Sequence, residues 1–236
     1  VQNAEAKTLE AINNAINDNP DDIAAIIIEP IQGEGGDNHF RTEFFQALRT
    51  ICDKNDIMLI FDEVQTGFGI TGKFWAYENY GIIPDMVSFG KKSQVCGMLC
   101  SKRIEEVEKN VFAESSRINS TFGGNLVDIV RLGRILEIIE EENLLANAAD
   151  VGAHLLNELI SLQNESSAIS NARGIGLFCA IDLPTGEERD KVISACYERK
   201  MIVLPCGTRS LRFRPALNVS KAEIDQAIEI LKSALK

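Results

Sequence analysis

The sequence is poor in the features that build metal centres, nucleic-acid interfaces and membrane spans. It has only two histidines, and its six cysteines form no CxxC pair, so no structural zinc site is expected. A formal net charge of −11 repels nucleic acid. No apolar run reaches the length of a membrane span. The composition, 45% hydrophobic and 25% charged, is instead typical of a soluble enzyme.

The cysteines also indicate the cellular compartment in which the protein is expected. Most of them lie within apolar segments, where cysteine acts as a small buried residue. Unpaired thiols are typical of a reducing environment. The chain begins at Val1 directly in helix-like sequence, and we expect no signal peptide. These features predict a cytoplasmic protein.

Hydrophobic periodicity predicts an α/β fold in two parts. Strands that alternate with helices are typical of parallel βαβ units, so we expect a mostly parallel sheet. We place the first domain at 1–142, including a long connecting helix, and a smaller α+β domain at 143–236. The expected helices span 4–17, 41–54, 125–142, 144–162, 186–199 and 221–235, with a short helix near 72–80. The expected strands span 23–28, 57–61, 86–89, 174–182, 201–204 and 210–214.

One carboxylate and one amine follow two of the predicted buried strands. Asp62 comes directly after the apolar run 57–61, and Lys91 follows the strand 86–89 and one glycine. Parallel strands bring their carboxyl ends to the same sheet edge, where open α/β sheets bind ligands. Pyridoxal phosphate requires a lysine for its Schiff base and an acid at its pyridine nitrogen. A turn carboxylate and a solvated loop lysine are the structural alternatives.

Four longer stretches resemble one known family. They are IIIEPIQGEGG (26–36), LIFDEVQTGFG (59–69), PDMVSFGKKSQVCG (84–97) and STFGGN (120–125). They are similar to the class III, or subgroup II, aminotransferases, which depend on pyridoxal phosphate. The resemblance implies a fold-type I transferase: part of the large cofactor-binding domain followed by the carboxy-terminal small domain. Complete family members are considerably longer, so the chain looks like the later part of one.

The resemblance also selects between two neighbouring lysines. In the family motif the lysine that binds the cofactor follows a small residue, here Gly90, which favours Lys91 over Lys92. Lys91 would then be the catalytic residue and carry a proton between substrate and cofactor, which requires a neutral amine. Asp62 would keep the pyridine nitrogen protonated.

Further cofactor contacts are implied by the same motifs. Val64 would pack on one face of the ring, and the Gln65 amide would donate a hydrogen bond to its phenolic oxygen. Thr121, with neighbouring Ser120, resembles a threonine that binds the phosphate across a dimer interface; an ordinary polar turn is the alternative. The resemblance therefore implies a homodimer with shared active sites.

Substrate recognition is expected from an acidic and a basic residue far apart in the chain. Glu34 of the EPIQGE stretch and Arg212 of the LRFRP stretch resemble a gate in which the glutamate covers the arginine until a dicarboxylate arrives. A structural salt bridge, or an Arg212 that faces solvent as Arg214 would, is the alternative. Asn119 is a candidate substrate contact or a simple turn residue.

The resemblance implies transfer of the terminal amino group of L-lysine to 2-oxoglutarate, which gives 2-aminoadipate 6-semialdehyde and L-glutamate. Ornithine, acetylornithine and 4-aminobutyrate remain alternative donors, and a non-catalytic truncated relative is a second class of explanation. The family's phosphate cup, its ring-stacking aromatic residue and its carboxylate-binding arginine have no counterpart in this sequence. We therefore expect the chain alone to have little or no activity.

Overall fold

The structure is a computed structural model that describes residues 1–119, 121 and 123–236. It divides into two units, which are described here one at a time. The first unit contains residues 1–30, 40–65 and 77–136, and the second contains 31–39, 66–76 and 137–236. The predicted domain boundary after residue 142 stays a prediction.

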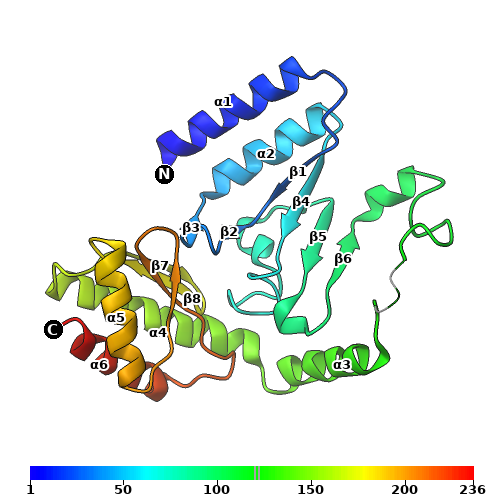
Figure 1. Cartoon of the computed structure of the whole chain (residues 1–236). Helices are drawn as coiled ribbons and strands as arrows, with labels where there is room; N and C mark the ends of the chain where they lie inside the picture. The colour runs from blue at the N-terminus through cyan, green and yellow to red at the C-terminus, as the bar shows by residue number, and fades with distance from the viewer. Residues whose placement is uncertain (120, 122) are drawn as a thin grey trace. The chain divides into compact units, whose positions relative to one another are not determined.

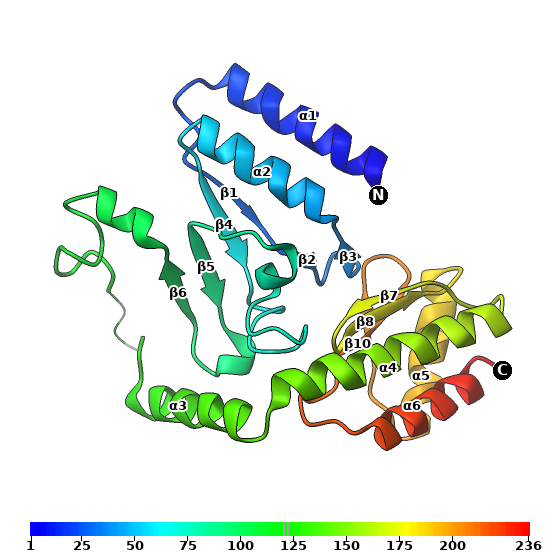
Figure 2. The same cartoon turned by 180° about the vertical axis from the view of Figure 1, so that it is seen from behind.

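A four-stranded sheet forms the centre of the first unit. Its order is β1-β4-β5-β6; β1, β4 and β5 run parallel, and β6 pairs antiparallel with β5 (Figure 1). The strands are β1 (Ala25–Ile28), β4 (Met58–Asp62), β5 (Met86–Phe89) and β6 (Gly97–Cys100). Helices α1 (Gln2–Asp18) and α2 (Thr42–Lys54) lie side by side in both views (Figures 1 and 2). The parallel α/β arrangement predicted from the alternating elements is confirmed.

Aromatic side chains pack α2 onto the central strand. Phe45 of α2 contacts Phe61 of β4 edge-on, with ring centroids 5.3 Å apart, and Tyr80 at 4.6 Å. Both phenylalanines are fully buried. Large buried rings contribute most of the apolar area in a core of this size, so this cluster holds the helix against the sheet.

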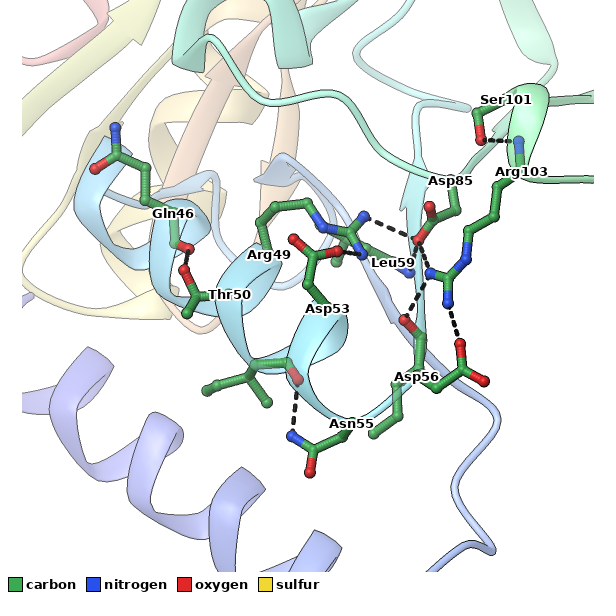
Figure 3. Close-up of polar contacts among 12 residues, drawn as sticks. Gln46, Arg49, Thr50, Asp53, Asn55, Asp56, Leu59, Asp85, Ser101 and Arg103 are labelled. Carbon is green, nitrogen blue, oxygen red and sulfur yellow. Dashed lines mark hydrogen bonds and ion pairs between the residues drawn. The ribbon is translucent and has the colours of Figure 1, made fainter. Parts of the chain in front are cut away.

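A buried carboxylate sets the stagger between β4 and β5 (Figure 3). Asp85, the residue before β5, accepts a hydrogen bond from the Leu59 backbone N–H of β4 at 2.7 Å. It also pairs with Arg49 of α2 at 2.8 Å and with Arg103 at 3.3 Å. Arg103 in turn pairs with Asp56. A carboxylate with several charge-assisted partners is held rigidly, so the strand start is tied to its neighbours.

The second unit is a small antiparallel sheet with helices packed against it (Figure 2). Its order is β7-β8-β10-β9, and β8 is buried along its whole length. The strands are β7 (Ser170–Ile175), β8 (Phe178–Asp182), β9 (Leu204–Cys206) and β10 (Ser210–Phe213); the helices are α4 (Leu144–Glu165), α5 (Gly186–Glu198) and α6 (Lys221–Ala234). A short hairpin of β2 (Ile31–Gln32) and β3 (Asn38–His39) belongs to this unit.

The long connecting helix, α3 (Leu126–Glu141), runs from the first unit into the second. Three short 3₁₀ segments complete the described elements: Ala76–Tyr80, Lys91–Ser93 and Lys102–Glu106. No helix in the described part of the chain is both long and apolar enough to cross a membrane.

Two strand predictions were wrong in detail. The single strand expected over 174–182 is a hairpin of β7 and β8, which turns at Gly176 with φ +57°. The strand expected over 201–204 begins only at Leu204. The β2–β3 hairpin and β6 were not predicted, because two- and four-residue strands leave too little periodicity to recognise.

The β7–β8 turn also explains a glycine in the middle of α4. A Cβ atom on Gly152 would lie 2.1 Å from the Gly176 carbonyl carbon, which no backbone tolerates without movement. The close approach of helix and hairpin therefore requires glycine at position 152.

We predict that Gly152→Ala destabilises the protein by about 1–3 kcal/mol, since the new methyl group displaces the hairpin. Gly133→Ala is the matched control, because a Cβ at that position in α3 meets no atom within 4 Å. That control should be neutral or stabilising by up to about 1 kcal/mol. Urea unfolding of both variants checks this, and equal stabilities would contradict it.

Candidate active site

The predicted acid and amine lie at one edge of the first unit's sheet. Asp62 ends β4 and pairs in register with Ser88 of β5. The Glu63 backbone N–H continues this pairing by donating to the Ser88 carbonyl at 2.9 Å. Lys91 follows β5 after Gly90. Because β4 and β5 are parallel neighbours, both functional residues leave the sheet at the same end.

The turns that carry these two residues contact each other. A Cβ atom built on Gly90 would lie 3.8 Å from a methyl carbon of Val64 and 3.1 Å from the Cys96 sulfur. Asp62 is oriented by its own turn, since its Oδ1 accepts the Val64 N–H at 3.0 Å. A side chain at position 90 would be tight against Cys96 but would meet Val64 at ordinary van der Waals distance.

The two neighbouring lysines differ in their surroundings. The Nζ of Lys92 donates to the Gln65 carbonyl at 2.5 Å. Lys91 is exposed, and its amine has no hydrogen bond or ion pair among the described residues. Its φ of +53° is uncommon for a residue with a side chain, and such strained positions are frequent at functional sites. An amine without these contacts fits the role predicted for Lys91, which stays a prediction.

This set of residues fits pyridoxal phosphate. The site offers a carboxylate for a ring nitrogen, an unengaged amine, an aliphatic side chain in Val64 and an amide in Gln65. In the described part of the chain no three His, Cys, Asp or Glu residues are grouped as metal ligands.

The remaining predicted cofactor and substrate contacts are in a loop before α3. Asn119 and Thr121 are exposed in the first unit. Ser120 lies outside the described residues. The proposed roles of these three residues stay predictions.

The predicted gate pair is formed within the second unit. The Arg212 guanidinium on β10 contacts a Glu34 carboxylate oxygen at 2.8 Å. The two side chains differ greatly in exposure, 14% for Arg212 and 73% for Glu34. The Nε of Arg212 is buried and has no hydrogen-bond partner among the described residues. An ion pair with one exposed partner is weak, so the carboxylate can be displaced.

The model of the family named aminotransferase class-III matches residues 1–235. The chain belongs to the class III aminotransferases. These enzymes depend on pyridoxal phosphate.

Among curated relatives, an L-lysine-epsilon aminotransferase of Mycobacterium tuberculosis is 52% identical over 232 residues, which cover 98% of this chain and 52% of that protein. A mitochondrial 4-aminobutyrate aminotransferase of Sus scrofa is 40% identical over 222 residues, which cover 92% of this chain and 43% of that protein. The chain thus spans about half the length of the curated relatives it matches.

A solved structure of an aminotransferase also matches this chain. A lysine aminotransferase from M. tuberculosis in the internal aldimine form superposes with a TM-score of 0.96 at 52% identity, over 98% of this chain and 53% of that one. The fold-type I transferase predicted from the motifs is confirmed by this match.

Sequence reasoning missed a buried cluster beside the predicted gate pair of this class III aminotransferase. Arg214, expected to face solvent, lies 3.1 Å from the Phe178 ring centroid and pairs with Asp37 at 2.5 Å. Burial raises the pKa of Asp37, which the neighbouring Arg214 partly offsets. The only available signal was the position of Asp37 shortly after Glu34.

His39 belongs to the same cluster. Its ring contacts Phe178 edge-on at 6.4 Å between centroids, and its Nε2 is buried without a hydrogen-bond partner among the described residues. Burial, together with the positive charges of Arg173 and Arg214, lowers its pKa to about 4. The folded protein therefore holds this ring neutral through the weakly acidic range.

We predict a pH-dependent loss of stability caused by His39. The unfolded chain takes up the proton near pH 6.5 but the folded chain only near about 4, so stability falls as the pH drops through this window. Relative to His39→Gln, the wild type should lose roughly 2 kcal/mol between about pH 7.5 and about pH 5. Urea unfolding at both pH values measures the difference, and parallel pH profiles would contradict it.

Proposed function

We propose that this chain carries the catalytic lysine of an aminotransferase that transfers the terminal amino group of L-lysine to 2-oxoglutarate. The products would be 2-aminoadipate 6-semialdehyde and L-glutamate. The observation that carries the proposal is the pair of Asp62 and the unengaged Lys91 at the ends of two parallel strands. The lysine donor is supported by relatives that are 50–52% identical and named for that substrate.

When bound, pyridoxal phosphate supplies a covalent link to an amine and an electron-accepting ring. Asp62 would place its carboxylate at the ring nitrogen and keep that nitrogen protonated. Lys91 would hold the cofactor and then, as a free neutral amine, carry the proton from the substrate carbon to the cofactor. Its exposed position without an acidic partner among the described residues favours ready exchange between these two tasks.

The neighbouring side chains would orient the cofactor. Val64 would pack against the ring, and Gln65 would donate to the phenolic oxygen, its backbone being held by Lys92. Thr121, together with Ser120, would bind the phosphate, since hydroxyl groups and exposed turn amides are good phosphate donors. Asn119 would contact the substrate.

Glu34 and Arg212 would allow one site to bind both the amino donor and 2-oxoglutarate. With an amino donor that brings no second carboxylate, Glu34 stays on Arg212 and neutralises it. With 2-oxoglutarate, the exposed Glu34 side chain moves away, and the guanidinium binds the distal carboxylate in bidentate fashion. The short contact and the unequal exposure of the two side chains support this assignment.

We further propose that the enzyme is a cytoplasmic homodimer. The first unit exposes apolar side chains that a second copy would cover, which fits a phosphate contact from the partner subunit. These exposed residues are Met98, Leu99, Phe112, Leu126, Val127 and Val130.

Replacement of Lys91 tests the catalytic assignment. Lys91→Ala should lower turnover at least about a hundredfold, because no amine remains to move the proton. Lys92→Ala should retain the covalently bound cofactor. Borohydride fixation of the holoenzyme followed by peptide mapping measures the attachment site directly, and label on Lys92 would overturn the assignment.

An amino-donor panel tests the substrate. L-lysine should be preferred over ornithine by about tenfold or more in kcat/KM, the range expected for a difference of one methylene group. The panel should include 4-aminobutyrate, because relatives named for that substrate also match this chain. A preference for either alternative donor would replace the lysine assignment while leaving the reaction class intact.

A further inference from the structure

The loop that carries Glu34, residues 33–37, is fixed along its backbone. The Glu34 carbonyl accepts the Gly207 N–H at 2.8 Å. Arg173 donates to the Gly36 carbonyl at 2.6 Å and to the Asp37 carbonyl at 2.8 Å. The Glu34 side chain differs from this fixed backbone, because its carboxylate is exposed and contacts Arg212 alone among the described ion pairs.

The same loop contributes a second carboxylate that cannot leave. Asp37 is fully buried, with an exposed fraction of 0%, and it pairs with Arg214. The Arg214 guanidinium also stacks on Phe178. A buried ion pair with these contacts is costly to separate, since either group alone would be an uncompensated buried charge.

The two arginines are two residues apart at the end of β10. Arg212 belongs to β10, and Arg214 directly follows the strand. Each pairs with a different carboxylate of the 33–37 loop. If Asp37 carried no charge, Glu34 would be the remaining acidic residue of the loop, and Arg214 would compete with Arg212 for it.

We propose that Asp37 and Arg214 are positioning residues that reserve Glu34 for Arg212. Their mutual neutralisation leaves Arg212 as the one guanidinium of the pair whose partner a substrate carboxylate can displace. The balance between amino donor and dicarboxylate acceptor is therefore set by a buried pair that contacts neither substrate. This inference rests on the proposed gate function of Glu34 and Arg212.

The test is Asp37→Asn in the holoenzyme. Asparagine keeps the side-chain shape and tolerates the positive φ of +48° at this position. Arg214 should then draw Glu34 away, so Arg212 is uncovered more often. Glutarate, an unreactive five-carbon dicarboxylate, should bind about fivefold tighter or more by calorimetry. The KM for the amino donor should rise while kcat of that half-reaction stays unchanged.

A second variant separates this effect from simple loosening of the loop. Asp37→Asn combined with Arg214→Met removes both charges and keeps a long apolar side chain on Phe178. Glutarate affinity and donor KM should return close to the wild-type values. Weaker or unchanged glutarate binding in Asp37→Asn, or no recovery in the double variant, would overturn the proposal.

Arg212→Ala distinguishes this failure from failure of the gate itself. If the gate assignment holds, that variant loses glutarate binding whatever the outcome at Asp37. If Arg212→Ala binds glutarate as the wild type does, the proposed gate is wrong, and the role of Asp37 falls with it.

Discussion

The parallel pairing of β4 with β5 is the constraint on which the predicted cofactor-binding residues depend. Asp62 stands opposite Ser88, and a shift of one residue would turn its side chain to the other face of the sheet. Asp85 resists such a shift because it ties the start of β5 to the Leu59 N–H and to Arg49. The contacts that fix the register of the predicted catalytic residues therefore lie at the other end of the strands. There the charge-assisted hydrogen bonds of Asp85 are buried.

The two ion pairs of the predicted gate region, Glu34–Arg212 and Asp37–Arg214, differ in their exposure to solvent. Both carboxylates of the 33–37 loop meet a guanidinium, but Asp37 does so in the protein interior and Glu34 in contact with solvent. Burial makes the first pair permanent, and solvent makes the second one exchangeable. A single loop can therefore combine a rigid backbone with one responsive side chain.

The reaction class and the donor rest on different kinds of evidence. The class follows from a family match over 1–235 and from residues whose chemistry suits one cofactor. The donor depends on discrimination by one methylene group, worth only about 1–3 kcal/mol. Such a difference is distributed over pocket shape, and relatives named for lysine and for 4-aminobutyrate share much of this chain.

Apolar runs and chain order were sufficient to predict the parallel sheet, most helices and the place of Asp62 and Lys91, because these follow from local periodicity and from the geometry of parallel strands. The strand 86–89 was predicted with its observed ends. Short hairpins were missed, since a strand of two residues carries no period. The contacts of Lys92 with Gln65 and of Asp37 with Arg214 came only from the folded chain. No local sequence pattern shows whether Arg212 or Arg214 pairs with the buried carboxylate of Asp37, which is distant in sequence. That pairing depends on how the 33–37 loop packs against the end of β10.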